Sequence, residues 1–234
     1  MSPFTACIVQ TTSLPYDKQG NLDRALRAME AAAARGASLI LFPEMFLTGY
    51  LIRDQLAQLA EPYPNGPALT VLGQKAKALS LGVVMGMPLA NPGGKPYNAV
   101  VMIDRDGTPA GFQAKTHFFG GEEKMFAPGT SLRAFDTSFG RMGILVCYDG
   151  EFPETARSLA LDGAKLICMC APMRTTTSCT CGPGPWRTAR IPSTATMSET
   201  KSGSTTAARA EPSTPPGAFW RRPAPRRRPP SMPS

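Results

Sequence analysis

Three residues that can carry acyl-transfer chemistry close three short, largely apolar runs of the sequence. Glu44 ends LILFPE, Lys115 ends GFQAK and Cys147 ends GILVC, and each run has the composition of a buried strand. A thiol can attack a carbonyl carbon, a carboxylate can move protons, and an ammonium can stabilise an oxyanion. A cysteine between a strand and a following helix also lies where backbone N–H groups and the helix dipole favour a thiolate. The pattern therefore predicts thiol-mediated acyl transfer.

Each of these residues also has a structural interpretation. A cysteine at a strand end commonly belongs to the core, and a Pro-Glu step after a strand is commonly a solvated turn. A lysine before Thr-His is commonly on the surface. The joint occurrence of all three residues favours the catalytic interpretation.

The motifs around these residues resemble those of a known family. They are FPE followed by TGY, then KTH, then CYD followed by EFPE. From about residue 4 to residue 172 the chain resembles, in order and spacing, the nitrilase (carbon–nitrogen hydrolase) superfamily. The resemblance implies an α-β-β-α sandwich, a catalytic set of Glu44, Lys115 and Cys147, and assembly into homodimers or larger oligomers.

The resemblance also implies a supporting glutamate and a substrate class. The supporting glutamate maps onto Glu122, with its neighbour Glu123 as the alternative. Members with Tyr-Asp after the cysteine, as in this chain, resemble amidases, whereas true nitrilases more often have Trp-Glu. A small-molecule amide is therefore the expected substrate, with aliphatic amides, ω-amides and N-carbamoyl compounds all left open.

In the expected reaction, Cys147 attacks the amide carbonyl to form a thioester. Glu44 takes the thiol proton, passes it to the leaving amine and later activates water. Lys115 and the backbone N–H of Tyr148 stabilise the oxyanion, and Lys115 further favours the thiolate. Three aromatic residues are predicted to line the substrate pocket, although core packing explains them equally well: Tyr50, Phe118 and Phe119.

Six cysteines and a single histidine limit the possible metal chemistry. The two Cys-x-Cys pairs, at 168–170 and 179–181, lack the two-residue spacing of structural zinc sites. The first pair alternates along an apolar run that is typical of a buried strand. His117 is expected to pack beside the site. We therefore expect no metal and no other cofactor.

The net charge of +8 is confined to the C-terminal part of the chain. Residues 1–173 hold 15 Lys+Arg and 15 Asp+Glu, whereas residues 174–234 hold 10 basic and 2 acidic residues. The part with the predicted catalytic residues therefore gives no support for a specific nucleic-acid partner. The first ten residues lack the pattern of a signal peptide, and no apolar stretch approaches the roughly 20 residues of a membrane span. We expect a cytoplasmic protein with no membrane partner.

Apolar periodicity predicts alternating strands and helices through residue 173. Strands are expected at 4–10, 38–42, 83–87 and 165–170, helices at 21–35, 67–81 and 153–161, and hairpins at 98–114 and 132–147. Asn21 is the expected N-cap of the first helix. This alternation favours a layered α/β fold. With the resemblance, it predicts one carbon–nitrogen hydrolase domain over residues 1–173, an α-β-β-α sandwich that is incomplete at its C-terminal side.

The sequence changes character after Pro172. Residues 174–234 contain no Leu, Val, Tyr, Asn or Asp but 11 of the 24 prolines, which predicts a disordered tail. A basic nucleic-acid-binding tail, a flexible linker and translation in the wrong frame would each produce such a segment. Shifted codons permit YDDVLHVRARSMENR from residue 174 and DPTGRVLA from residue 213, and both resemble family segments in register. We therefore favour a frameshift, and expect the chain as written to be an inactive product on simple amides.

Overall fold

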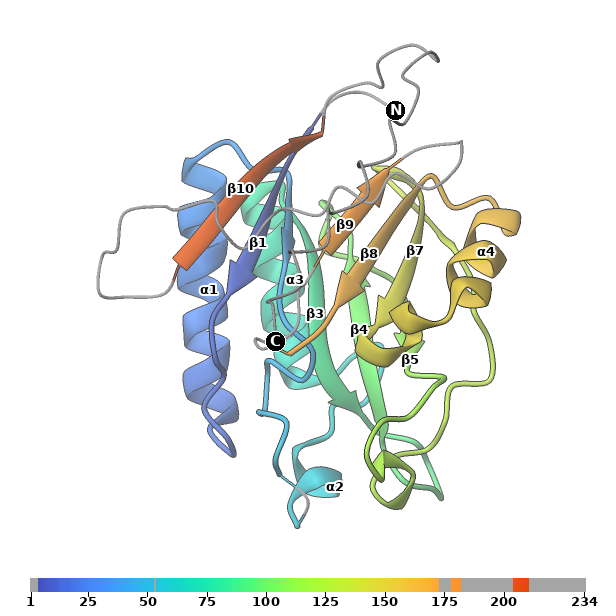
Figure 1. Cartoon of the computed structure of the whole chain (residues 1–234). Coiled ribbons are helices and arrows are strands. Elements are labelled where there is room, and N and C mark those ends of the chain that lie inside the picture. Colours follow the sequence, from blue (N-terminus) through green and yellow to red (C-terminus); the bar gives the residue numbers. More distant parts are fainter. Residues whose placement is uncertain (1–3, 53, 173–177, 182–203, 211–234) are drawn as a thin grey trace, which may run out of the picture.

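The computed structural model describes residues 4–52, 54–172, 178–181 and 204–210 (Figure 1). In these ranges the strands form two sheets. The first sheet has the order β10-β1-β2-β3-β4-β5, formed by Ser204–Ala210, Phe4–Gln10, Leu39–Leu41, Gly82–Leu89, Tyr97–Ile103 and Pro109–Ala114. The second sheet has the order β6-β7-β8-β9, formed by Phe135–Thr137, Gly140–Val146, Leu166–Cys170 and Ser178–Cys181.

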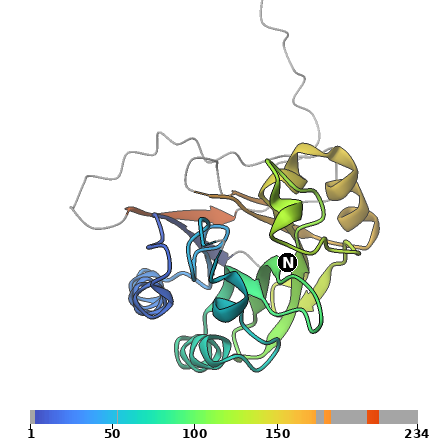
Figure 2. The ribbon, with the colours of Figure 1, turned by 90° about the horizontal axis from the view of Figure 1, so that it is seen from below.

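Helices cover the outer face of each sheet (Figure 2). The helices α1 (Lys18–Ala34) and α3 (Pro67–Leu79) pack on the first sheet, and α4 (Pro153–Leu161) packs on the second. A short helix, α2 (Leu56–Leu59), lies in the connection before α3. The layers therefore form the predicted α-β-β-α sandwich. None of the helices within the described ranges is long and apolar enough to cross a membrane.

Alternation along the strands divides the apolar residues between the layers. On β2, Leu39 and Leu41 face the second sheet, whereas Ile40 packs with the helix side. On β7, Ile144 contributes to the core between the sheets, and Leu145 packs with α4. Successive strand residues point to opposite faces, so a strand covered on both sides needs an uninterrupted apolar run. This explains the continuous runs that precede Glu44 and Cys147, on β2 and β7.

The first helix starts earlier than its sequence pattern predicts. Asp17 is its N-cap, and its carboxylate accepts a hydrogen bond from Gly20 N at 2.9 Å. Asn21 is fully buried instead, and its side chain exchanges hydrogen bonds with the backbone of Leu14. The predicted N-cap is therefore wrong, because Asn21 pairs with a distant loop and not with its own helix.

Two strands lie in the segment that the sequence predicts to be a disordered tail. β9 pairs antiparallel with β8, and β10 pairs antiparallel with β1 from Phe4 to Gln10. At these positions the structure has strands where the sequence analysis expects no regular structure. The rest of residues 174–234 lies outside the described residues, and the domain boundary at residue 173 stays a prediction.

Candidate active site

Cys147 lies where β7 ends in a strained turn. The 3₁₀ helix η2 (Cys147–Glu151) begins at this residue. Cys147 has a φ of 49°, in the left-handed region that non-glycine residues rarely adopt. Backbone strain of this kind costs about 1–3 kcal/mol and collects at functional sites. The α-helix α4 begins only at Pro153, so its dipole does not start at the thiol as the sequence analysis expects.

A buried lysine joins two buried carboxylates in this site. Lys115 Nζ lies 2.9 Å from Glu44 Oε1 and 2.8 Å from Glu122 Oε2. Glu44 follows β2, Lys115 follows β5, and Glu122 begins the 3₁₀ helix η1 (Glu122–Lys124). All three side chains are at most 2% exposed. Because buried ions need partners, these charges stabilise one another. The structure thus brings together three of the four predicted catalytic side chains in direct contact.

Glu122, and not its neighbour Glu123, is the acidic residue of η1 that reaches the lysine. Its carboxylate accepts hydrogen bonds from Tyr50 Oη at 2.6 Å and from Phe119 N at 2.8 Å. Glu123 is exposed, and its backbone carbonyl accepts a hydrogen bond from Lys95 Nζ. Tyr50, a predicted pocket residue, is therefore tied to the charged cluster by its hydroxyl group.

A fully buried asparagine completes the cluster. Asn98, on β4, donates from Nδ2 to Glu44 Oε1 at 2.7 Å and to Glu122 Oε1 at 3.3 Å. The sequence analysis places Asn98 only in a hairpin and misses its contact with the site. A polar residue at the start of the apolar run AVVMI was the available signal, because buried polar side chains need hydrogen-bond partners.

Asp149 is a second buried polar residue near the site whose role was not predicted from the sequence. It is fully buried, and it accepts hydrogen bonds from Thr116 N at 3.1 Å, Thr116 Oγ1 at 2.7 Å and His117 N at 2.8 Å. Its other oxygen accepts a hydrogen bond from Val146 N at 3.3 Å. This one carboxylate therefore links the loop after Lys115 to the turn that presents the thiol.

The electrostatic environment keeps the thiol protonated. Burial raises the pKa of Cys147 to about 12, the negative charge of Glu44 adds to this shift, and Lys115 opposes it without overcoming it. These surroundings therefore oppose the thiolate that the position of Cys147 and the charge of Lys115 were expected to favour. Burial also raises the pKa of Glu44, although the Lys115 charge and hydrogen bonds from Lys115 and Asn98 act in the opposite direction. Glu44 Oε2 has no hydrogen-bond partner among the described residues, so one oxygen is available to accept a proton.

Aromatic side chains surround the turn after Cys147. The His117 ring stacks on Phe152 with ring centres 4.1 Å apart, and Tyr148 meets Phe152 edge-on. Phe119 lies edge-on to Tyr148 and is 61% exposed, whereas Phe118 packs against a small buried cluster. Of the predicted pocket residues, Phe119 is thus the one open to solvent, and Phe118 fits the core-packing alternative.

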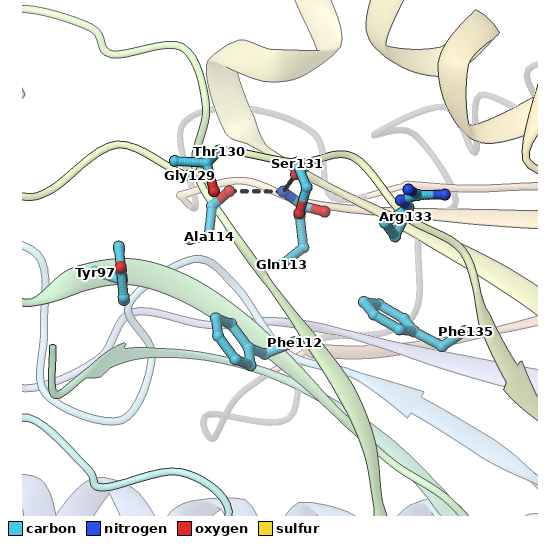
Figure 3. Close-up of a pocket in the computed structure, with 9 residues that line it drawn as sticks. All are labelled: Tyr97, Phe112, Gln113, Ala114, Gly129, Thr130, Ser131, Arg133 and Phe135. Atoms are coloured by element: carbon cyan, nitrogen blue, oxygen red, sulfur yellow. Dashed lines mark hydrogen bonds between the residues drawn. The ribbon is translucent and has the colours of Figure 1, made fainter.

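A pocket of about 280 Å³ lies outside this cluster (Figure 3). Its lining residues are Tyr97, Phe112, Gln113, Ala114, Gly129, Thr130, Ser131, Arg133 and Phe135. The Gln113 amide nitrogen donates to the carbonyl oxygens of Ala114 and Ser131, so it is already paired. The predicted catalytic residues do not line this pocket. Within the described ranges, no group of three or more His, Cys, Asp or Glu residues could hold a metal ion.

The chain is similar over most of its described length to several curated proteins. It is 36% identical over 160 residues to an (R)-stereoselective amidase from Pseudomonas sp., which covers 68% of this chain and 57% of that protein. It is 35% identical over 165 residues to a nitrilase from Pyrococcus abyssi, with 68% and 61% covered. It is 35% identical over 160 residues to the N-carbamoylputrescine amidase of Solanum lycopersicum, with 64% and 53% covered. The chain spans little more than half the length of these relatives.

Solved structures of the same kind share the fold. An amidase from Nesterenkonia sp. superposes with a TM-score of 0.65 at 30% sequence identity, covering 72% of this chain and 64% of that one. In a mutant of the amidase from Nesterenkonia sp. AN1, the acetamide moiety of fluoroacetamide is covalently added at the active-site cysteine.

A family-wide comparison covers nearly the whole described part of the chain. Residues 5–209 match the carbon–nitrogen hydrolase family, and this range includes both sheets and every residue of the charged cluster. The match also extends past residue 173, where the sequence analysis ends the resemblance. With the sandwich fold and the relatives above, this chain belongs to the carbon–nitrogen hydrolase family.

Proposed function

We propose that this chain carries the catalytic site of an amide hydrolase that works through a cysteine thioester. The observation that carries the proposal is the buried contact of Lys115 with Glu44 and Glu122. The thiol of the strained Cys147 lies close enough for the charges of all three residues to act on it. Burying three charges is costly, and the paired geometry is of no evident use to the core. A base, a cation and a nucleophile held together in this way supply the groups that acyl transfer requires.

The first half of the reaction uses the protonated thiol that the site favours. Cys147 Sγ attacks the amide carbonyl carbon while Glu44 takes the thiol proton through its free oxygen. Lys115 has three N–H donors, and its Nζ lies within 2.9 Å of Glu44 Oε1 and of both oxygens of Glu122, so one of these contacts is exchanged for the oxyanion. The N–H of Tyr148, in the first turn of η2, is the second donor, because N–H groups there lack helical partners.

The second half of the reaction returns the site to its starting state. The tetrahedral intermediate collapses, the C–N bond breaks, and Glu44 gives its proton to the departing amine. Glu44 then removes a proton from water, whose oxygen attacks the thioester carbon. The carboxylic acid leaves as the C–S bond breaks, and the thiol regains the proton from Glu44. Each turnover therefore consumes one amide and one water, and regenerates both Cys147 and Glu44.

The substrate class follows from the relatives, and we propose a small amide. Relatives include a stereoselective amidase and N-carbamoylputrescine amidases, and a mutant Nesterenkonia amidase has been solved in complex with butyramide. Butyramide and an N-carbamoyl amine are therefore the first substrates to compare. The ordered aromatic group around Phe119 and Tyr148 is a candidate surface for selecting between them. Homo-oligomers and a cytoplasmic location stay predictions.

Ammonia release from these two substrates tests the proposal. The protein is best assayed with residues 174 onward restored to the alternative frame, beside the chain as written. Cys147→Ala is expected to reduce turnover to background, and Glu44→Gln and Lys115→Ala to do nearly as much harm, because residues that act as one unit are not additive. Cys7→Ala, at another buried cysteine, is the matched control. More than trace turnover by Cys147→Ala would overturn the proposal.

A further inference from the structure

Asn98 is the buried polar side chain of the site that the proposed reaction does not use. We propose that Asn98 is a positioning residue that keeps Glu44 in its ionised form as the base for Cys147. The inference rests on the proposed function, because Asn98 has this task only if Glu44 accepts the thiol proton.

The geometry places Asn98 in contact with all three charged residues. Its side-chain nitrogen donates to Glu44 Oε1 at 2.7 Å and to Glu122 Oε1 at 3.3 Å. Its backbone carbonyl accepts a hydrogen bond from Lys115 N at 2.8 Å, just after β5 ends beside β4. An amide nitrogen has two hydrogens, and carboxylate oxygens only accept, so this orientation uses both donors. One residue of β4 thereby fixes the spacing of the two carboxylates and the starting point of the lysine side chain.

The charges around Glu44 explain why a donor is needed there. Glu44 faces one cation, Lys115, and one anion, Glu122, and it lies close enough for its charge to act on Cys147 and Tyr50. Burial and the neighbouring anion favour the protonated carboxyl group, which cannot accept a proton. Lys115 and Asn98 both donate to the same oxygen, Oε1, and both favour the ionised carboxylate. Their contacts also leave Oε2 as the free oxygen.

The other end of the Asn98 side chain argues against a purely structural role. Asn98 is fully buried, and its Oδ1 has no hydrogen-bond partner among the described residues. A buried acceptor without a donor typically costs about 1–3 kcal/mol. An apolar residue at this position would avoid that cost. We therefore attribute the presence of an asparagine at this position to the hydrogen bonds that its Nδ2 donates to Glu44 and Glu122.

The pH dependence of thiol alkylation tests this inference on the full 234-residue chain without requiring turnover. The chain is treated with iodoacetamide at a series of pH values, and the rate at Cys147 is followed by peptide mass spectrometry. The rate is expected to rise as Glu44 ionises and becomes able to remove the thiol proton. This rise, the one followed in every variant, lies well below the pH near 12 at which the thiol ionises without a base. In Asn98→Ala the rise is expected to move to higher pH, because a carboxylate that loses a donor holds its proton more tightly. Above the rise, the rate is expected to approach that of the unchanged chain.

Two further variants separate this role from a structural one. Asn21→Ala removes another fully buried asparagine, whose side chain bonds to the backbone of Leu14 and Leu47, and is expected to leave the midpoint of the rise unchanged. Asn98→Ser keeps one donor and is expected to give a midpoint between those of the unchanged chain and Asn98→Ala. If Asn98→Ala does not fold, the midpoint of Asn98→Ser alone tests the inference.

The outcomes distinguish the inference from the proposed function. If Glu44→Gln abolishes the pH-dependent rise while the Asn98 variants keep the original midpoint, the inference about Asn98 is overturned and the proposed base stands. A uniform loss of rate in the Asn98 variants, with no change of midpoint, overturns the inference as well. If Glu44→Gln keeps the full rise, Glu44 is not the base, and the proposed function and the inference fall together.

Discussion

At the scale of single residues, the site combines the strained backbone of Cys147 with the buried charges of Glu44, Lys115 and Glu122. Cys147 has positive φ, and so does Met45, which follows Glu44. Both residues therefore sit in conformations that the surrounding packing must hold in place. Because burial and the charge of Glu44 raise the pKa of Cys147, the proposed attack by this thiol requires a base. In the proposed reaction, the proton passes from the half-buried Cys147 to the buried Glu44.

Removal of the lysine charge is expected to destabilise the fold. Lys115→Met leaves Glu44 and Glu122 buried without their cation, which typically costs about 3–5 kcal/mol. Lys75→Met, which breaks the surface pair with Glu30, is the matched control and is expected to cost about 0–1 kcal/mol. Urea unfolding of both variants measures the difference. Equal losses of unfolding free energy would show that the buried cluster is not held together by Lys115.

The same variant is expected to change the pH dependence of stability. Burial already raises the pKa of Glu44, and in Lys115→Met this effect no longer meets the opposing charge of the lysine. A carboxyl group with a raised folded-state pKa destabilises the fold as pH rises through that value. The loss of unfolding free energy in Lys115→Met should therefore be larger at about pH 8 than at about pH 5. A loss of unfolding free energy that is the same at both pH values would contradict this prediction.

At the scale of elements, the site depends on how closely loops approach strands. Gly86 on β3 lies against the loop that carries Glu44, and a Cβ there would meet Pro43 O at 2.3 Å, Met45 N at 2.6 Å and Glu44 Cα at 2.7 Å. All three are backbone atoms and cannot give way as a flexible side chain would. The absence of a side chain at Gly86 therefore allows the loop that carries Glu44 to lie directly against β3.

Gly86→Ala is expected to abolish ammonia release by displacing Glu44 from Lys115. Catalytic groups must be held within about 0.5 Å of the productive geometry. Gly94→Ala is a suitable control, because its new Cβ would meet only the side chain of Asn91 in an exposed loop. Turnover of Gly86→Ala equal to that of Gly94→Ala would show that the close approach does not position the base.

Removal of the Asp149 carboxylate is expected to destabilise the fold, because it links the loop after Lys115 to the turn at Cys147. In Asp149→Ala the N–H groups of Thr116, His117 and Val146 lose their acceptor, at about 1–3 kcal/mol for each group left unpaired. Asp106→Ala removes an exposed carboxylate that bonds only within its turn, and should cost about 1 kcal/mol or less. Thermal unfolding compares the two. A similar shift in Tm would argue against the linking role.

At the scale of the whole molecule, the layered fold was predictable from alternating apolar runs and the family motifs. The runs that end in Glu44 and Cys147 are visible because strands covered on both faces need continuous apolar sequence. The run before Lys115 forms the edge strand β5, of which only the last two residues are buried. The roles of Asn98 and Asp149 could not be predicted from the sequence, because their hydrogen-bond partners lie on other strands and loops. The direction in which the pKa of Cys147 shifts was not predictable for the same reason: the balance of burial, Glu44 and Lys115 depends on distances that no spacing in sequence reveals.

The chain as written is expected to release far less ammonia than a version with the frame restored after residue 173. The motivation is the composition of residues 174–234, which lack the branched apolar residues Leu and Val. The chain also covers only 64% of the Nesterenkonia amidase to which it is similar. Both proteins are to be assayed side by side on butyramide. Equal turnover would show that the frame after residue 173 is immaterial to activity.

The measurement that tests the central claim most directly is capture of the acyl group on the nucleophile. The frame-restored chain is mixed with butyramide, quenched in acid during turnover, digested and analysed by mass spectrometry. We predict a butyryl group on the peptide that contains Cys147, formed with loss of ammonia and absent from the Cys147→Ala variant. Release of ammonia with no acyl group on Cys147, or with the acyl group on another residue, would contradict the account.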